Sequence, residues 1–402
     1  MTKRPSILTH VSSRFQATII WLLVGVIIAL LAILLSNPNA FLDLNINLRA
    51  GTRLIDGEPV FGVADPVEGL LFSHTPFAAV VYGLFSLLGG LAPPVWTVLS
   101  LVALTRSSYL LVSHMPSFLP KLSAPTRTAC VASLLVVLSP FVENLRLGQI
   151  SIFLLWTVCE AFFAKTQRTG AVLLGVATAM RLTPLGFIAL LPLIRRTRDA
   201  VISLATTVVC TLVGFAVLPS ASIEYFGPTL FEADRVGGAP EMISNQSING
   251  LLWRLFGPGG APYLWLMTAG AVILLAWYVG RRNWQLSRPL IAVGAVAIGI
   301  LLASPVSWDH HWVIAAPVGC GLWILASDKR NWPLMCLLGA TYLVFLSRII
   351  YRVPHYGGVE FSLTWWQQIP GNAFVITGGA LLAVTVFTSR PSSKRESLGK
   401  IQ

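Results

Sequence analysis

A lone carboxylate stands just beyond the first long apolar run of the sequence, in the segment Phe41-Leu42-Asp43-Leu44-Asn45. A carboxylate at the edge of an apolar environment can have its pKa tuned so that it accepts a proton near neutral pH. Asp43 is therefore a candidate general base. The alternative is that Asp43 only caps a short interfacial helix.

The densest polar cluster of the chain lies between two apolar runs and reads Ser304-Pro305-Val306-Ser307-Trp308-Asp309-His310-His311-Trp312. Adjacent side chains on a helix point about 100° apart, so two neighbouring histidines suit a shared metal ion less well than histidines four residues apart. We expect this cluster to form hydrogen bonds to an anionic or sugar ligand. An aromatic belt at the membrane interface is the alternative interpretation.

A third polar segment, Ser244-Asn245-Gln246-Ser247-Ile248-Asn249-Gly250, is followed by Arg254. Amide side chains both donate and accept hydrogen bonds, which suits sugar hydroxyls. The same residue types also cap helices and build turns, so the segment could equally be a helix start.

Arg181 stands inside an apolar run, in Arg181-Leu182-Thr183-Pro184. An arginine within a membrane needs a partner, and a lipid phosphate suits the planar guanidinium. Pro184 would kink or break a helix at this point. The alternative is that Glu160 neutralises the charge of Arg181, or that a backbone carbonyl accepts its hydrogen bonds.

Weaker signals occur at three helix starts or loops. His74-Thr75-Pro76 precedes one apolar run, and Glu143, Asn144, Arg146, Gly148 and Gln149 precede another; each group could be a helix start and nothing more. The last outside loop holds His355, Tyr356, Trp365 and Trp366, for which anchoring at the membrane interface is the expected role and ligand binding is the alternative.

The composition is that of a membrane protein. Of 402 residues, 55% are hydrophobic and 11% are charged, against roughly 25% charged in an ordinary soluble domain. A soluble enzyme is excluded. The net charge of +12 does not indicate nucleic-acid binding, because the basic residues cluster at five expected loops or chain ends, as the positive-inside rule describes for cytoplasmic segments.

We predict an all-α polytopic membrane protein with about twelve spans and both termini in the cytoplasm. In the front half, Lys121, Arg127, Lys165 and Arg168 fall in loops that this count places outside, against the charge rule. A single span over 170–194 keeps the parity, and a broken hairpin turning at Arg181–Pro184 is the alternative. The predicted spans are 17–36, 77–91, 95–112, 129–142, 150–164, 170–194, 199–218, 263–280, 289–303, 311–327, 333–347 and 371–388.

The chain is read as one integral domain, with a helical module over 1–218, a second over 219–388 and a cytoplasmic tail over 389–402. Segments 37–75 and 219–262 are expected outside, and the former should contain short interfacial helices. The five cysteines all lie in apolar runs without a CxxC pair, so we expect neither a disulfide framework nor a metal site. Few ionisable residues fall within the spans, which argues against an ion-coupled carrier.

Taken together, these motifs resemble glycosyltransferase family 87. The resemblance covers nearly the whole chain, and its most specific parts are the Asn-Gln-Ser and Ser-Trp-Asp-His-His segments. It implies a GT-C fold, an all-helical membrane enzyme whose site faces the extracytoplasmic side and takes a sugar from a polyprenyl-phosphate donor. Two departures are Leu44-Asn45-Ile46-Asn47, where a tyrosine is expected, and Arg181, where many members carry lysine. The motifs that carry the resemblance are Asp43-Leu44, Gly57-Glu58-Pro59-Val60, His74-Thr75-Pro76, Gly148-Gln149, Arg181-Leu182-Thr183-Pro184 with Arg195-Arg196, Asn245–Gly250 and Ser304–His311.

The resemblance implies transfer of mannose from polyprenyl-phosphomannose to a mannosylated lipid or lipoglycan, forming an α-(1→2) bond with inversion. Asp43 is the implied base, and His310 and His311 act at the donor. We expect no cofactor, no metal and no nucleic acid. A polyprenyl-phosphoarabinose-dependent arabinofuranosyltransferase and, further off, a lipid-linked sugar flippase are the alternatives. Donor or phosphate contacts are expected from Arg181, Asn245, Gln246, Trp308 and Asp309, and acceptor or sugar contacts from His74, Asn249 and Arg254.

Overall fold

The computed structural model describes residues 12–37, 40–227, 239–328 and 330–389. Within these residues the protein is all-α, with helices α1 to α18 joined by short 3₁₀ segments and one isolated bridge between Asn245 and Trp308. The predicted fold class is confirmed to that extent. The predicted tail over 389–402 lies outside the described residues except for Ser389.

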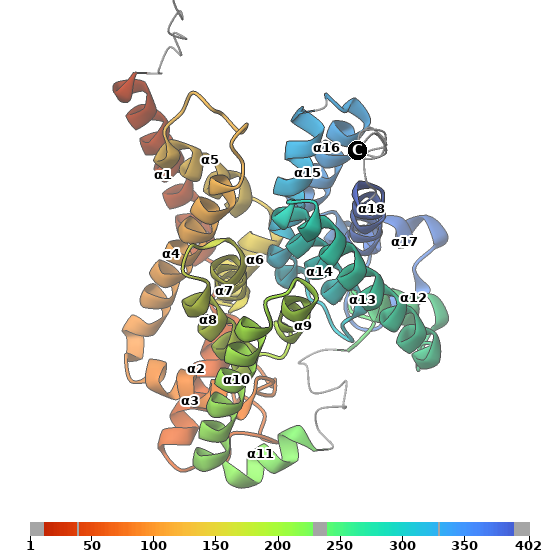
Figure 1. Ribbon diagram of the computed structural model, residues 1–402. Coiled ribbons are helices and arrows are strands. Elements are labelled where there is room, and N and C mark those ends of the chain that lie inside the picture. Colours follow the sequence, from red (N-terminus) through yellow and green to blue (C-terminus); the bar gives the residue numbers. More distant parts are fainter. Residues whose placement is uncertain (1–11, 38–39, 228–238, 329, 390–402) are drawn as a thin grey trace, which may run out of the picture.

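The helices form two groups, with the chain's first part on the left of Figure 1 and α12 to α18 on the right. The first group is α1 (Ser13–Leu35), α2 (Leu42–Ile55), α3 (Pro76–Ser86), α4 (Ala92–Ser113), α5 (Ala124–Val136), α6 (Ser139–Leu147), α7 (Ser151–Phe163), α8 (Gln167–Met180), α9 (Leu185–Leu193), α10 (Thr197–Val217) and α11 (Pro219–Phe226). The second is α12 (Ile248–Phe256), α13 (Pro262–Gln285), α14 (Pro289–Ala303), η4 (Asp309–Ala315), α15 (Ala316–Asp328), α16 (Trp332–Ser347), η5 (Ile349–Arg352), η6 (Val359–Ser362), α17 (Trp365–Gly371) and α18 (Ala373–Thr388).

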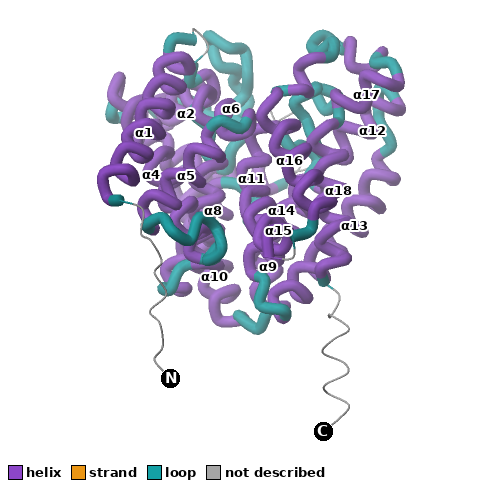
Figure 2. The backbone as a smooth tube through the Cα atoms, turned by 90° about the horizontal axis from the view of Figure 1, so that it is seen from above, coloured by secondary structure: helices purple, strands orange, loops and turns teal. Residues whose placement is uncertain are grey.

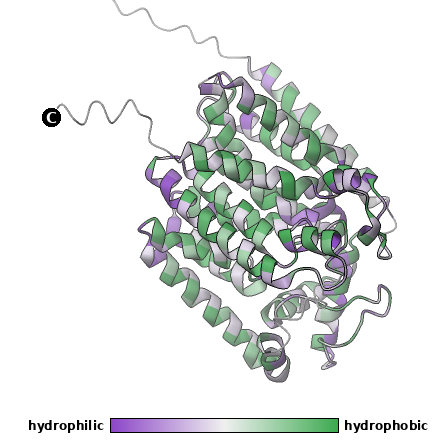
Figure 3. Ribbon diagram, turned by 90° about the vertical axis from the view of Figure 1, so that its right-hand side faces the viewer, coloured by the Kyte–Doolittle hydropathy of each residue, from purple (hydrophilic) through white to green (hydrophobic). Residues whose placement is uncertain are grey.

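Hydrophobic residues make up most of the helical ribbon in Figure 3. Among the described residues, four helices are long and apolar enough to cross a membrane, or six if each of two bent pairs counts as one span. The protein is therefore a multi-pass membrane protein, but the expected number of twelve spans is not reached by this measure. The predicted span 77–91 is not one helix of that length, because α3 has only 11 residues and ends at Ser86.

One end of the molecule collects basic helix ends. The side chain of Gln16 near the start of α1 accepts from Ser123 N at the start of α5, over 3.0 Å. Arg127, also in the first turns of α5, donates to Met115 O just past the end of α4. The rings of His114 and Phe163 lie 5.2 Å apart, so the ends of α4 and α7 meet there too.

The same end continues into the second group of helices. Arg196 lies 5.6 Å above the ring of Phe162, and Phe162 lies 6.1 Å from Trp284 near the end of α13. Arg288 donates to Thr388 O at the end of α18. We call this face the basic end. It is made by the helix ends that carry Arg127, Lys165, Arg196 and Arg288.

The basic end corrects the loop assignment of the front half. The expected topology placed Lys121, Arg127, Lys165 and Arg168 on the face opposite Arg196. In the structure Arg127, Lys165 and Arg168 lie at the ends of helices that meet near Arg196, so the conflict with the charge rule disappears. It arose because 77–91 was counted as a span and 170–194 as only one.

The apolar run 170–194 is a broken hairpin, and its interpretation as a single span is wrong. α8 leaves the basic end and stops at Met180, and α9 starts at Leu185 and returns to Arg196. Pro184 cannot continue a helix without loss of a hydrogen bond. The hydroxyl of Thr75 donates to Ala179 O over 2.6 Å, which satisfies a carbonyl that the break exposes.

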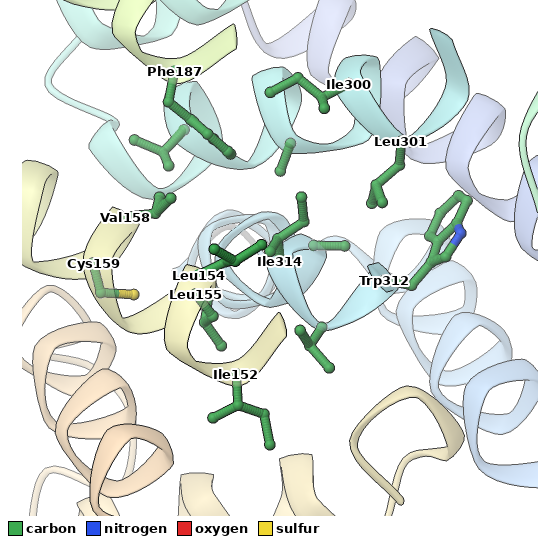
Figure 4. Close-up of a cluster of buried hydrophobic side chains, with 14 of the residues drawn as sticks. Ile152, Leu154, Leu155, Val158, Cys159, Phe187, Ile300, Leu301, Trp312 and Ile314 are labelled. Atoms are coloured by element: carbon green, nitrogen blue, oxygen red, sulfur yellow. The ribbon is translucent and has the colours of Figure 1, made fainter. Parts of the chain in front are cut away.

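The core holds η4 between the two groups of helices. Figure 4 shows Leu154, Leu155 and Val158 of α7 packed near Ile314 of η4, with Leu301 of α14 and Trp312 close by. Because η4 follows directly on Trp308, this packing fixes the polar cluster at one end of the core. Figure 2 shows α2, α6, α12 and α17 towards one edge of the molecule and α9 and α10 towards the opposite one.

Candidate active site

A polar cavity of about 260 Å3 opens at the end of the molecule opposite the basic end. Its walls come from the start of α2, the loop before α3, the end of α6, the break between α8 and α9, the start of η4 and the loop after α16. Segments far apart in the sequence thus meet around one space. The residues that line it include Asp43, His74, Glu143, Arg146, Gln149, Arg181, Ser244, Trp308, Asp309, His310, Tyr351 and Tyr356.

Asp43 is held at the first turn of α2 by the end of α6. The amide of Gln149 donates to Asp43 Oδ2 over 2.7 Å, and Phe41 N donates to Arg146 O over 2.6 Å. Gly148 ends α6 in the left-handed conformation with φ 69°, and a Cβ there would lie 2.6 Å from Leu44 Cβ. Only glycine allows this close approach, which brings the carboxylate and Gln149 together.

Arg181 points a half-buried cation into the cavity without a carboxylate partner among the described residues. Its Nη2 lies 2.6 Å from His311 Nε2, and its Nη1 is buried without a hydrogen-bond partner in the same part of the chain. Glu160 does not neutralise it, because Glu160 pairs with Arg106 at 2.7 Å. A half-buried guanidinium with free donors is an incomplete site, which an anion would complete.

The three histidines of the site are almost fully buried. Burial, reinforced by the charges of Arg181 and His310, lowers the pKa of His74 to about 3. Burial and Arg181 also hold the pKa of His311 well below its usual range. Both ring nitrogens of His74 and of His310 lack hydrogen-bond partners within the described chain, and His310 Nδ1 lies 3.5 Å from Asp309 Oδ1. These groups can therefore donate to or accept from a bound molecule.

Asp309 is oriented by its neighbours at the start of η4. Tyr351 donates its hydroxyl to Asp309 Oδ2 over 2.9 Å, and His310 N donates to Oδ1 over 2.8 Å. Burial raises the pKa of Tyr351, with Asp309 as a further cause. The buried carboxylate of Glu143 pairs with Arg146 at 2.7 Å and with Arg348.

The Asn-rich segment lies beside the cavity but does not line it, apart from Ser244. The amide of Asn245 spans Pro240 O and Ser307 N, and that of Gln246 donates to Ile243 O and Gly371 O and accepts from Phe374 N. Asn249 donates to Pro305 O over 3.0 Å.

Arg254 is 2% exposed and bonds Asn372 and the carbonyls of Glu241, Met242 and Asn245. The structure thus brings together Asp43, His74, Arg181, Trp308, Asp309 and His310 around the cavity, with His311 behind Arg181. It commits Asn245, Gln246, Asn249 and Arg254 to protein contacts.

Two groups of lining residues were missed or undervalued by the sequence reasoning. Tyr351 carried no signal, because one tyrosine after an apolar run is common. Glu143, Arg146 and Gln149 were only weaker signals that could equally be a helix start, although Gly148-Gln149 also carried the family resemblance. For Tyr356, interface anchoring was preferred over ligand binding. A run of three polar side chains on one turn before Gly148 was the available signal.

The fold and the cavity define the chain as a multi-pass helical membrane protein with a charged site at one end. Residues 72–305 match the family model described as glycosyltransferase family 87. The chain belongs to this family and is a glycosyltransferase. No solved structure matches it.

Three of its relatives are mannosyltransferases that act on phosphatidylinositol mannosides. The chain is 30% identical over 407 residues to the polyprenol-phosphate-mannose-dependent alpha-(1-2)-phosphatidylinositol mannoside mannosyltransferase of Mycobacterium tuberculosis, covering 96% of this chain and 94% of the relative. The protein of that name from Mycolicibacterium smegmatis is 30% identical, and the alignment covers 85% of this chain and 83% of the relative. A phosphatidylinositol pentamannoside mannosyltransferase of M. tuberculosis is 29% identical, and the alignment covers 76% of this chain and 72% of the relative.

Proposed function

We propose that this protein transfers mannose from polyprenol-phosphate-mannose to a hydroxyl of a phosphatidylinositol mannoside, forming an α-(1→2) bond. The family and the names of relatives that align along most of the chain support this substrate pair. The same names favour mannose over the arabinofuranosyl alternative. The polar site at one end of the helices also favours an enzyme over a flippase.

The observation that carries the proposal is the juxtaposition, in one cavity, of a carboxylate and a cation that has no carboxylate partner among the described residues. Asp43 and Arg181 both line it. A carboxylate can accept the proton of an attacking hydroxyl. A half-buried guanidinium can bind a lipid phosphate and stabilise the charge that develops when this phosphate leaves.

The reaction is a single displacement at the anomeric carbon. The acceptor hydroxyl attacks C1 of the mannose and transfers its proton to Asp43. The bond between C1 and the phosphate oxygen breaks, and the electron pair stays on the polyprenyl phosphate beside Arg181. His74 and His310 supply hydrogen bonds to the phosphate or sugar, and His311 contacts Arg181 beside them. A β-linked donor gives the α product by inversion.

Gln149 orients the base. Its amide nitrogen holds Asp43 Oδ2 and leaves Oδ1 for the acceptor hydroxyl. The amide oxygen of Gln149 is buried without a partner in the described chain, so it can accept from a second hydroxyl of the acceptor sugar. Asn245 and Asn249 act as positioning residues, because they tie the segment before α12 to Ser307 and Pro305 ahead of the η4 segment that carries His310. Gln246 and Arg254 tie the same segment to residues 371–374 instead.

The cavity faces the extracytoplasmic side, and the basic end faces the cytoplasm. The collection of Arg127, Lys165, Arg196 and Arg288 at one end supports this orientation. The all-α architecture is consistent with the GT-C fold that the family resemblance implies. Chain termini on the cytoplasmic side agree with the positions at which α1 begins and α18 ends.

The test is transfer of labelled mannose from polyprenyl-phosphomannose in membranes that contain wild-type or variant protein. Asp43→Asn should lose about 100-fold to 10,000-fold in rate, the range of general-base catalysis. The matched control is Asp56→Asn at the other end of α2, an exposed residue that should retain wild-type activity. Full activity of Asp43→Asn at wild-type protein levels would remove Asp43 as the base, and no transfer by the wild type would remove the mannosyl donor.

A further inference from the structure

A second, apolar cavity of about 440 Å3 lies between the two groups of helices. Its walls are α5 and α6 on one side and α15 and α16 on the other. Figure 1 labels these four helices. The lining is hydrocarbon and aromatic, with Leu134, Phe141, Trp323, Leu338 and Phe345 among its residues. The hydroxyl of Tyr342, one of its few polar groups, is used in a bond to Leu134 O at 3.0 Å.

This lateral cavity shares two walls with the polar cavity. On α6, Pro140 and Phe141 face the lateral cavity, whereas Glu143 and Arg146 face the polar one. On η4, Asp309 and His310 line the polar cavity, and Trp312 and Ala315 line the lateral one. Between the two spaces, Glu143 of α6 pairs with Arg348 just past α16. The ion pair thus marks the place where an apolar space gives way to a charged one.

Two helical glycines keep the lateral cavity open. Gly319 of α15 and Gly339 of α16 both line it, and a Cβ added at either would meet nothing within 4 Å. Glycine weakens a helix interior, and atoms around a void lose dispersion contacts. A flexible hydrocarbon chain would restore those contacts.

We infer that the lateral cavity binds the isoprenoid chain of the lipid-phosphate donor, an inference that rests on the proposed function. The chain of such a donor is attached directly to the phosphate that leaves, so it must begin next to the polar cavity. The acyl chains of a phosphatidylinositol mannoside are separated from the receiving hydroxyl by inositol and mannose. A hydrocarbon cavity adjoining the reaction site therefore fits the donor.

Cavity-filling variants test this assignment. Gly339→Leu projects a side chain into the space from α16, and Gly319→Leu does so from α15. The matched control is Gly270→Leu on α13, where an added Cβ also meets nothing within 4 Å. The KM for a long-chain polyprenyl-phosphomannose should rise about tenfold in both cavity variants, with kcat and the KM for the acceptor unchanged. With a geranyl-phosphomannose donor, variant and wild type should have the same KM.

Binding of radiolabelled long-chain polyprenyl phosphate to the purified protein separates this inference from the proposed function. The wild type and Gly270→Leu should bind it, and the two cavity variants should bind it about tenfold more weakly at an unchanged unfolding temperature. If the cavity variants bind more weakly but the wild type transfers no mannose, the result would support isoprenoid binding in the lateral cavity and contradict the proposed function. Equal binding by all proteins, or a rise in the acceptor KM alone, would overturn the inference.

Discussion

At the scale of single residues, the bond between Gln149 and Asp43 decides how the proposed base is presented. Gln149→Glu would place a second carboxylate where an amide now donates to Asp43 Oδ2. Two neighbouring carboxylates resist ionising together, so the pKa of the pair rises. We expect the acidic limb of the pH–rate profile to move to higher pH, with about tenfold lower activity at pH 7. Gln149→Ala removes a hydrogen bond donated to the charged form of Asp43, so it should lose activity and move that limb in the same direction but less far. An unmoved limb in both variants would contradict the orienting role.

His74 gives a prediction about pH and stability. Its pKa is about 3 in the folded protein, against an ordinary value of about 6.5 in an unfolded chain. Between these pH values the unfolded chain binds a proton that the folded protein does not. The free energy of unfolding should therefore fall as the pH drops below about 6.5, by up to roughly 1.4 kcal/mol per pH unit for one group.

The measurement is thermal unfolding in detergent between pH 4 and pH 8, as a planned range, for the wild type and His74→Gln. The variant should have a flatter pH dependence below pH ~6.5. Some dependence should persist, because His311 is shifted in the same direction. Identical slopes for the two proteins would mean that His74 is protonated in the folded state.

At the scale of elements, the junction of α6 with α2 sets the position of the site. Gly148→Ala would force an alanine into the left-handed backbone conformation and bring its Cβ within 2.6 Å of Leu44 Cβ. The matched control is Gly57→Ala, which has a φ of 75° but meets nothing within 4 Å. The control should lose about 1 kcal/mol of unfolding free energy, the usual cost of that backbone conformation. Gly148→Ala should lose more and should also lower kcat, because α2 carries Asp43; equal effects would show that the close approach is unimportant.

The Asn-rich segment before α12 provides a second prediction at this scale. Gln246→Ala removes two donated bonds and one accepted bond within the protein. It should lower the free energy of unfolding by roughly 1–3 kcal/mol for each buried group left unpaired. The donor KM of the remaining folded enzyme should not change. Gln285→Ala, at an exposed helix end, is the control, and a raised donor KM with unchanged stability would instead restore a direct substrate role.

The sequence predicted elements well where periodic apolar runs are long, as for α1, α10 and α13. It erred at α3 and at Arg181–Pro184, because hydropathy does not distinguish a short helix lying along an interface from a span, or one long span from two short ones. Only tertiary contacts, such as Thr75 with Ala179 O, decide between them. In the site, Asp43, Arg181 and His310 could be identified because they are polar residues within or next to apolar runs. Residue type could not assign Asn245 or Arg254, since an amide that binds sugar and one that binds backbone look alike.

At the scale of the whole molecule, the collection of basic helix ends predicts an orientation in the membrane. The reporters are Lys165→Cys at the basic end and Gly357→Cys in the loop beside the polar cavity, each in a chain with exposed Cys336 replaced by serine. In intact cells an impermeant thiol reagent should label Gly357→Cys only, and after permeabilisation it should label both. Labelling of Lys165→Cys in intact cells would reverse the proposed orientation.

The guanidinium of Arg181, which has no carboxylate partner in the described part of the chain, also bears on turnover. A phosphodiester donor carries one negative charge, whereas the polyprenyl phosphate left after transfer is a monoester with about −1.5 to −2 at pH 7. A fixed half-buried cation therefore attracts the spent carrier more strongly than the fresh one. The resting enzyme in a membrane would be the product-bound enzyme, and its speed would depend on how quickly the spent carrier is withdrawn from the bilayer.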